Sequence, residues 1–276
     1  MTDANHDLVD ELVRDGLDAR EARWLVEEFV PGADLDAVVA LRLGARRRLN
    51  GEPIQYIIGH WPFRSLDLDL DRRVLIPRPE TEELVGVAMT ELASADVKAP
   101  VIMDLGCGSG AIGLALLSEL AERGVVATLV CVDESSDALA VARRNALKHH
   151  LSAVTFVHSS WFSEVDPSLA GHVDLIVANP PYVGATEFEG LDPVLRYEPF
   201  DAIVAPDARG IAGFEDLETI INVSPAWLAP SGVLICEHSN EHRDAVMACA
   251  TSAGFTSVQD FDDMAGHPRV LVARLA

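Results

Sequence analysis

Hydrophobic residues recur at intervals of three and four positions through the first fifty residues of the chain. This spacing places apolar side chains on one face of a helix. It predicts three helices, over residues 7–13, 18–29 and 34–49. Pro31 and Gly32 are expected to separate the second helix from the third. The pattern therefore predicts a small helical domain over residues 1–54.

The period changes to two after this helical region. Leu66, Leu68 and Leu70 alternate with three aspartates, which is typical of a half-exposed strand. We expect a β-hairpin linker over residues 55–76. A helix is then expected to begin near Glu80 or Thr81.

From residue 100 onward, short apolar segments alternate with helical patterns. The predicted strands cover residues 101–105, 127–133, 154–160, 173–181, 232–239, 255–261 and 269–275. Alternation of strands and helices favours a parallel, doubly wound sheet with helices on both faces. Because no helix separates the last two strands, we expect them to form an antiparallel pair at one edge. The fold class is thus α/β, with a mostly parallel, seven-stranded, Rossmann-like sheet in residues 77–276.

The chain has 276 residues and a formal net charge of −23. Such acidity repels nucleic-acid phosphates unless a local basic patch overrides it, so we expect no direct nucleic-acid binding. The run Arg46–Arg48 either contacts an anionic partner or is a solvated helix end.

Other features of the composition exclude further classes of protein. No apolar run approaches the ~20 residues that span a bilayer, and the acidic N-terminus has no signal-peptide core. The four cysteines lack the spacing of disulfides or metal ligands. We expect a cytoplasmic protein with reduced thiols and no metal.

A glycine-rich segment, MDLGCGSGAIG at residues 103–113, follows the first strand of the sheet and opens a helix. Its glycines allow positive φ angles and a close approach of the backbone to a ligand, although they also suit a simple tight turn. Residues 108–113 fit the dinucleotide pattern G-x-G-x-x-G. Asp104, however, would face a pyrophosphate unfavourably. Its carboxylate suits the ammonium and sulfonium groups of S-adenosylmethionine, which is the cofactor that we expect.

Two further residues follow neighbouring strands. Asp133 ends the second strand and is placed to accept hydrogen bonds from ribose hydroxyls. A dinucleotide and S-adenosylmethionine both carry such hydroxyls, so this residue does not distinguish between them. Trp161 follows the third strand, and it either stacks on an adenine or belongs to the core.

The segment Asn179-Pro180-Pro181-Tyr182 ends the fourth strand. Both prolines have a fixed φ and no N–H, so they stop the strand and stiffen the corner. The Asn179 side-chain oxygen and the Pro180 carbonyl would form a fixed pair of acceptors, with Tyr182 available for stacking. Such a pair suits a planar –NH₂ group on an amide or a base and would orient it for methyl transfer. A turn without a chemical role is the alternative.

With these residues assembled, the chain resembles the glutamine N5-methyltransferases that modify peptide chain release factors. The specific part of the resemblance lies in GEPIQYIIGHWPF, residues 51–63, and LIPRPETEELV, residues 75–85. It implies a class I methyltransferase fold, a helical domain that contributes to substrate binding, and methylation of the Gly-Gly-Gln glutamine in class 1 release factors. S-adenosylhomocysteine would be the second product, and we expect a monomer.

The resemblance also implies roles for individual residues. The cofactor would be held by Asp104, Gly106, Cys107, Gly108, Ser109, Gly110, Asp133, Trp161, Asn179 and Thr81. The glutamine amide would be held by Asn179, Pro180, Pro181 and Tyr182, of which Asn179, Pro180 and Tyr182 would be catalytic. Arg78 and Glu80 would line the cleft beside Thr81.

Two stretches depart from the family pattern. Family members read Glu-Ile-Gly with a glutamine three residues later, whereas this chain has Glu237-His238-Ser239 and then His242. Where they carry Asp-Gly-Leu, this chain has Arg209-Gly210-Ile211. Alternative substrates are therefore a ribosomal-protein glutamine or an exocyclic amino group of a nucleic acid. A nicotinamide-dependent oxidoreductase and a non-catalytic partner protein are more distant alternatives.

Overall fold

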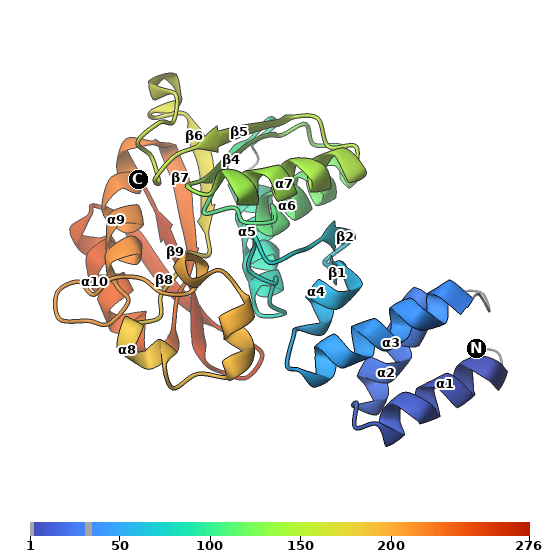
Figure 1. The fold of residues 1–276 in the computed structure, drawn as a ribbon. Coiled ribbons are helices and arrows are strands. Elements are labelled where there is room, and N and C mark those ends of the chain that lie inside the picture. The colour runs from blue at the N-terminus through green and yellow to red at the C-terminus, as the bar shows by residue number, and fades with distance from the viewer. Residues whose placement is uncertain (1–2, 31–34, 96) are drawn as a thin grey trace.

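The computed structural model describes residues 3–30, 35–95 and 97–276. Three helices form the N-terminal part: α1 (Asp3–Arg14), α2 (Ala19–Phe29) and α3 (Leu35–Leu49). They lie where the periodicity predicts them and bury a core of their own around Leu25 and Leu41. This part projects from the rest of the molecule (Figure 1). Pro31 and Gly32, expected between the second and third helices, lie outside the described residues.

A short helix and a hairpin connect this part to the sheet. They are α4 (Ile54–Ile58), β1 (His60–Phe63) and β2 (Leu66–Asp69), and the two strands pair in antiparallel fashion. The predicted linker thus begins with a helical turn, which Gly59 ends in a left-handed conformation with φ of 89°. Leu66, Leu68 and Leu70 are buried as their alternation predicts. The division into three domains stays a prediction.

The remaining strands form one seven-stranded sheet in the order β5-β4-β3-β6-β7-β9-β8. They are β3 (Val101–Leu105), β4 (Thr128–Asp133), β5 (Val154–His158), β6 (Val173–Ala178), β7 (Leu228–Glu237), β8 (Ser257–Asp262) and β9 (Pro268–Arg274). The first five run parallel, and β9 pairs in antiparallel fashion with both β7 and β8. This confirms the predicted fold class and its antiparallel edge.

Helices cover both faces of the sheet (Figure 1). One face carries α5 (Thr81–Ala95), α6 (Ala111–Glu122) and α7 (Ser136–Lys148), and the other carries α9 (Glu215–Val223) and α10 (Arg243–Ser252). The short α8 (Ala185–Phe188) follows β6. Single 3₁₀ turns cover Pro167–Leu169, Pro193–Tyr197, Phe200–Ala202, Ser224–Ala226 and Asn240–His242. Strand β7 begins at Leu228, four residues before its predicted start at 232, with an irregular register near that end.

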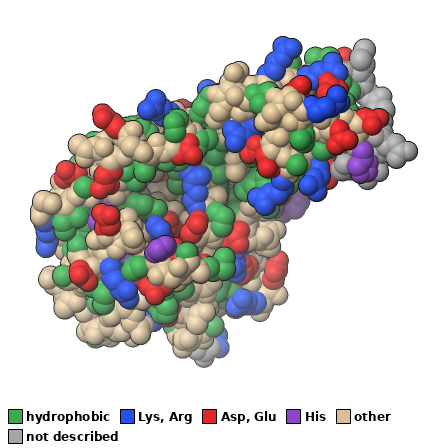
Figure 2. Space-filling view, turned by 90° about the horizontal axis from the view of Figure 1, so that it is seen from below, with side chains coloured by type: hydrophobic (Ala, Val, Ile, Leu, Met, Phe, Trp, Pro, Cys, Tyr) green, Lys and Arg blue, Asp and Glu red, His purple; other side chains and the backbone are tan. Residues whose placement is uncertain are grey.

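The surface shows how the charged residues are arranged. Figure 2 shows Lys and Arg side chains mixed with Asp and Glu over the face in view. In the run Arg46–Arg48, Arg47 pairs with Glu52 and Arg48 with Glu21, while Arg46 is exposed. All three arginines lie in the last turn of α3, which agrees with the helix-end interpretation.

Two further findings concern the cysteines and the lengths of the helices. All four cysteines are buried free thiols. No helix within the described residues is long and apolar enough to cross a membrane.

Candidate functional site

The register of the parallel strands brings the predicted site together. Leu105 at the end of β3 pairs with Val132 of β4 and with Ala178 of β6. Ala178 in turn pairs with Cys236 of β7. The next residues along these strands are Gly106, Asp133, Asn179 and Glu237. These four residues therefore lie side by side at the carboxyl edge of the sheet, where ligands bind in such folds.

The glycine loop between β3 and α6 adopts the predicted backbone. The φ angles of Gly106, Gly108 and Gly110 are 67°, 55° and 82°. A Cβ atom on Gly110 would lie 2.7 Å from Leu114 Cδ1, so that position requires glycine. A Cβ atom on Gly108 would meet nothing within 4 Å, so the loop has open space on that side.

Asp104 lies beneath this loop with 1% of its surface exposed. Its Oδ2 accepts a hydrogen bond from the Gly113 N–H at 2.9 Å. Its Oδ1 is buried and has no hydrogen-bond partner among the described residues. Burial raises the pKa of Asp104 to about 7, against the opposing effect of the Gly113 N–H. An acceptor is thus held ready beside the loop.

Asp133 braces the same loop from the neighbouring strand. Its two carboxylate oxygens accept from the Gly108 and Ser135 N–H groups, each at 2.8 Å. Each oxygen has a further lone pair, so the contacts with the protein leave acceptors for ribose hydroxyls. Burial raises the pKa of Asp133 although these backbone donors lower it.

Two loop residues have side chains that turn inward. Cys107 is buried beside Cys131, and Ser109 is buried with 3% of its surface exposed. A ligand would therefore meet the backbone at these positions. The buried Asn145 of α7 donates to the Ser109 carbonyl and also to the Asp69 carbonyl. This asparagine, which the sequence analysis missed, ties the loop to the hairpin.

Trp161 packs over the glycine loop in a left-handed backbone conformation, with φ of 48°. A Cβ atom on Gly106 would lie 3.3 Å from its Cζ3. Its Nε1 donates to Asp216 Oδ1 at 3.0 Å. The ring is half-buried at the edge of the core. The ring thus packs partly on the core, as one interpretation predicts, while stacking on an adenine stays a prediction.

The Asn179-Pro180-Pro181-Tyr182 corner begins directly after β6. Asn179 Nδ2 donates to Thr81 Oγ1 at 3.2 Å. Thr81 is the buried first residue of α5, and its hydroxyl donates to Glu237 Oε2 at 2.7 Å. The structure therefore brings Thr81, Asn179 and Glu237 together, from elements that lie far apart in the sequence.

Glu237 also binds the other end of the corner. Tyr182 donates a hydrogen bond from its hydroxyl to Glu237 Oε1 at 3.1 Å, which fixes the far end of the side chain, and stacking of its ring stays a prediction. Glu237 is 2% exposed, and burial raises its pKa against the effects of Thr81, Arg269 and Tyr182. Sequence reasoning noted Glu237 only next to a departure from the family pattern. A carboxylate that ends an apolar strand, as Asp133 does, was the available signal.

Arg78 and Glu80 do not join this network. Arg78 pairs with the buried Glu198 at 2.5 Å, and the same carboxylate accepts from the Ile76 N–H. Glu80 is exposed. Their predicted place along the cleft stays a prediction.

The loop of residues 206–214 supports the corner from behind. A Cβ atom on Gly213, whose φ is 64°, would lie 2.5 Å from the Tyr182 carbonyl oxygen. His242 Nε2 donates to the neighbouring Ala212 carbonyl at 2.8 Å. Arg209 pairs with Glu218 on α9. Of the residues that depart from the family pattern, Arg209 lies in this loop and His242 contacts it, whereas His238 pairs with Asp260 of β8.

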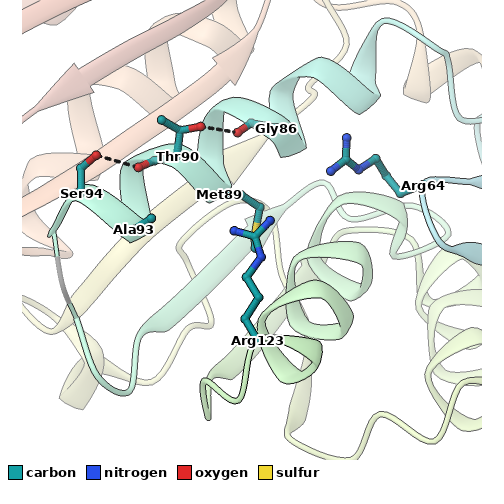
Figure 3. Close-up of a pocket in the computed structure, with 7 residues that line it drawn as sticks. All are labelled: Arg64, Gly86, Met89, Thr90, Ala93, Ser94 and Arg123. Atoms are coloured by element: carbon teal, nitrogen blue, oxygen red, sulfur yellow. Dashed lines mark hydrogen bonds between the residues drawn. The ribbon is translucent and has the colours of Figure 1, made fainter.

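A separate hollow of about 380 Å³ lies away from these residues. It is lined by side chains that include Arg64, Met89 and Arg123 (Figure 3). Arg123 follows the end of α6, which lies at the amino edge of the parallel strands. The hollow is therefore on the opposite edge from Gly106 and Asn179 and is separate from the site.

Comparison with known proteins adds independent findings. The family model of the methyltransferase small domain matches residues 87–190. A release factor glutamine methyltransferase from Haemophilus influenzae is 38% identical over 246 residues, which cover 86% of this chain and 81% of that relative. Another release factor glutamine methyltransferase, from Salmonella typhimurium, is 40% identical over a match that covers 83% of this chain and 78% of that relative.

Two solved structures share the fold at low sequence identity. A methyltransferase from Pyrococcus furiosus aligns with a TM-score of 0.51 at 15% identity, over 83% of this chain and 95% of that one. A 16S rRNA methyltransferase from T. thermophilus, solved with AdoMet and guanosine, aligns with a TM-score of 0.51 at 18% identity. It covers 73% of this chain and 44% of that one. The identity to the curated relatives, which extends over most of both chains, carries the assignment: this chain belongs to the release factor glutamine methyltransferase family.

Proposed function

We propose that this chain transfers a methyl group from S-adenosylmethionine to a side-chain amide nitrogen, that of the Gly-Gly-Gln glutamine in class 1 peptide chain release factors. The observation that carries the proposal is the bond from Asn179 Nδ2 to Thr81. It turns the Asn179 oxygen away from Thr81 and leaves it as an acceptor at the strand edge, beside the glycine loop. The names of the relatives support the substrate.

The residues on the cofactor side fit S-adenosylmethionine. Asp104 offers a buried carboxylate oxygen without a partner among the described residues, which suits the cofactor's ammonium group. Asp133 offers acceptors for ribose hydroxyls, and Gly106, Gly108 and Gly110 keep the loop close to the ligand. The half-buried Trp161 would border the adenosine. When bound, the cofactor supplies an electrophilic methyl group on sulfur.

The corner would hold the substrate amide on the other side. Asn179 Oδ1 and the Pro180 carbonyl would accept the two amide hydrogens, while Pro181 and Tyr182 keep the corner rigid. An amide nitrogen is a poor nucleophile because its lone pair is delocalised. Two fixed acceptors stabilise the positive charge that develops on nitrogen, and they hold it in line. No strong base is required, since the methylated nitrogen carries a positive charge that makes its proton strongly acidic; the proton passes to water and leaves the neutral N-methyl amide and S-adenosylhomocysteine.

The helical domain over residues 1–54 is proposed to contact the release factor, with the hairpin setting its position. We further propose that the chain acts as a cytoplasmic monomer. The net charge of −23 would disfavour direct binding to nucleic acid.

The test combines the purified protein with labelled cofactor and, in parallel, release factor, ribosomes or DNA. We expect label on the release factor glutamine only, identified by mass spectrometry as the addition of one methylene. Asn179→Ala should lower kcat/KM by about 100-fold to 1,000-fold, the usual loss for one preorganised polar contact. Asn222→Ala, an exposed asparagine of α9, is the matched control.

Other outcomes would separate the alternatives. Label on ribosomal protein or DNA alone would replace the proposed substrate, and full activity of Asn179→Ala would overturn the role of the corner. The methyltransferase family match argues against the oxidoreductase alternative. Calorimetry that detects NAD but no S-adenosylmethionine would revive it.

A further inference from the structure

A chain of hydrogen bonds links the substrate corner to a buried carboxylate. It runs from Asn179 Nδ2 to Thr81 Oγ1 at 3.2 Å and from the Thr81 hydroxyl to Glu237 Oε2 at 2.7 Å. Thr81 and Glu237 are 3% and 2% exposed, so water competes little for these bonds. The second Glu237 oxygen accepts from Tyr182 at 3.1 Å.

The number of protons shared along this series of hydrogen bonds fixes the direction of each bond. An ionised carboxylate only accepts, so the single Thr81 proton must point to Glu237. The lone pairs of Thr81 then remain for Asn179, and only the –NH₂ end of that amide can donate to them. The Asn179 oxygen must consequently face the other way, toward the position of the methyl acceptor.

We propose that Glu237 is a positioning residue, which acts through Thr81 to hold the Asn179 amide with its oxygen toward the methyl acceptor. The inference rests on the proposed function of the corner and extends it to Thr81 and Glu237, which are buried and bond Asn179 directly or through one another. Tyr182 bonds to the same carboxylate, so Glu237 fixes the side chains at both ends of the corner.

The same proton count shows what a neutral Glu237 would do. A protonated Glu237, or a glutamine in its place, can donate to Thr81 Oγ1. The Thr81 proton is then free to bond the Asn179 oxygen, which allows the amide to turn over. An –NH₂ group would then face the –NH₂ group of the substrate, so two donors would oppose each other and the acceptor would be lost.

This logic makes the orientation of Asn179 depend on the ionisation of Glu237. Burial raises the pKa of Glu237, so protonation begins at a higher pH than for an exposed glutamate. The groups that face Glu237 are Thr81, Tyr182, Arg269 and Glu80, with Cys236 as its buried chain neighbour. Since the ionised form is the active one, methyl transfer should fall as the pH falls through that pKa.

The test compares Glu237→Gln, Thr81→Val and Thr81→Ser with the unchanged protein. We expect Glu237→Gln and Thr81→Val each to lower kcat about 10-fold to 100-fold, with the S-adenosylmethionine Kd of Glu237→Gln changed less than about threefold. Thr81→Ser keeps the hydroxyl and should restore most of the rate. The double variant Thr81→Val/Glu237→Gln should be no slower than the slower single variant, because both changes interrupt the same series of hydrogen bonds. Glu237→Gln should also lose the acid limb of the kcat profile.

Matched controls separate positioning from general damage. Thr90→Val changes an exposed threonine of the same helix, and Glu91→Gln changes a carboxylate paired with Arg274. Both should retain the unchanged rate and pH profile. An unchanged kcat and acid limb in Glu237→Gln would overturn the inference, as would additive losses in the double variant.

A measurement on the protein without substrate distinguishes a failure of this inference from a failure of the proposed function. The side-chain ¹H–¹⁵N signals of Asn179 should move with pH in the unchanged protein and stay fixed in Glu237→Gln. Signals that move identically in both proteins would overturn the coupling even if release factor methylation proceeds. If the signals respond as expected but no release factor is methylated, the proposed substrate fails and the coupling stands.

Discussion

Carboxylates are partly or wholly buried in two regions of this molecule, and the two regions treat them in opposite ways. In and beside the linker, Glu52, Asp67 and Asp69 are all paired with cationic side chains. At the carboxyl edge of the sheet, Asp104, Asp133 and Glu237 accept from neutral N–H and O–H donors. The first group is neutralised within the fold, whereas the second has no direct ion pair among the described residues to compensate its charge when it ionises.

The pKa directions follow this difference. Arg47 lowers the pKa of Glu52 to about 2 against the cost of burial, with help from Arg72. Burial dominates at the other region, and it raises the pKa of Asp104, Asp133 and Glu237. Ionising these groups costs free energy that no cation in direct contact offsets within the part of the chain that the structure describes.

The comparison separates acids that hold elements of the fold together from Asp104 and Asp133, which we propose to face a ligand. A paired carboxylate holds two elements together, as Glu52 joins the end of α3 to the linker. Carboxylates held by neutral donors at a strand edge favour a positively charged ligand, and S-adenosylmethionine carries two positive groups. Uncompensated charge at the site is a feature that binding would relieve.

The largest expected effect concerns Asp104. With a folded pKa of about 7 and an ordinary value of 3.8, the folded protein retains a proton that the unfolded chain releases. The stability of the cofactor-free protein should therefore decrease as the pH rises from about 4 to about 7. Asp104→Asn should lack this decrease, and so gain on the order of 4 kcal/mol relative to the unchanged protein between these limits. Denaturant unfolding at several pH values measures it.

The same variant should bind S-adenosylmethionine more weakly, which distinguishes a functional acid from a merely strained one. Calorimetry at pH 8 checks this result. If the free energies of unfolding of the two proteins differ by the same amount at every pH from 4 to 8, this result would contradict the raised pKa of Asp104.

The sequence predicted this site in outline because strand ends and motifs are local features. The alternation of strands and helices gave the carboxyl edge, and the segments at Asp104, Asp133 and Asn179 each follow a predicted strand. What local patterns could not supply was the order of the strands. Glu237 lies beside Asn179 only because β7 pairs with β6, and nothing within either segment encodes that pairing.

The predicted linker shows a second limit. Its leucine alternation correctly gave the buried face of β2, but residues Ile54–Ile58 form a helical turn before the hairpin. Five residues are too few for a helical period to stand out from a strand pattern. Similarly, the role of Asn145 depends on α7 lying against the hairpin, since its side chain bonds Asp69 and Ser109. Such tertiary contacts have no local signature.

A smaller effect, of opposite sign, is expected at Glu52. Its lowered pKa means that its contribution to stability is present above about pH 4.5 and disappears as the pH falls toward 2. Glu52→Gln should lower the free energy of unfolding by about 1.5 kcal/mol at pH 7, a value discounted because Arg47 and Arg72 are about half exposed. Denaturant titration at pH 7 and pH 3 should show the two proteins converging at the acid end. The affinity of Glu52→Gln for S-adenosylmethionine should be unchanged. A weaker affinity would contradict a purely structural role for Glu52.

The smallest effect is expected where the linker charges are most solvated. Lys148 of α7 bridges Asp67 and Asp69 at 2.8 and 2.7 Å, and its side chain is one third exposed. Lys148→Met should cost less than about 1 kcal/mol, because exposed ion pairs gain little over hydration. The difference should shrink further in molar salt, which screens exposed charges. Lys148→Arg, which keeps the charge, should retain the salt dependence in urea unfolding. A loss of several kcal/mol that ignores salt would show that this cluster behaves like a buried pair and that Lys148 anchors the hairpin to α7.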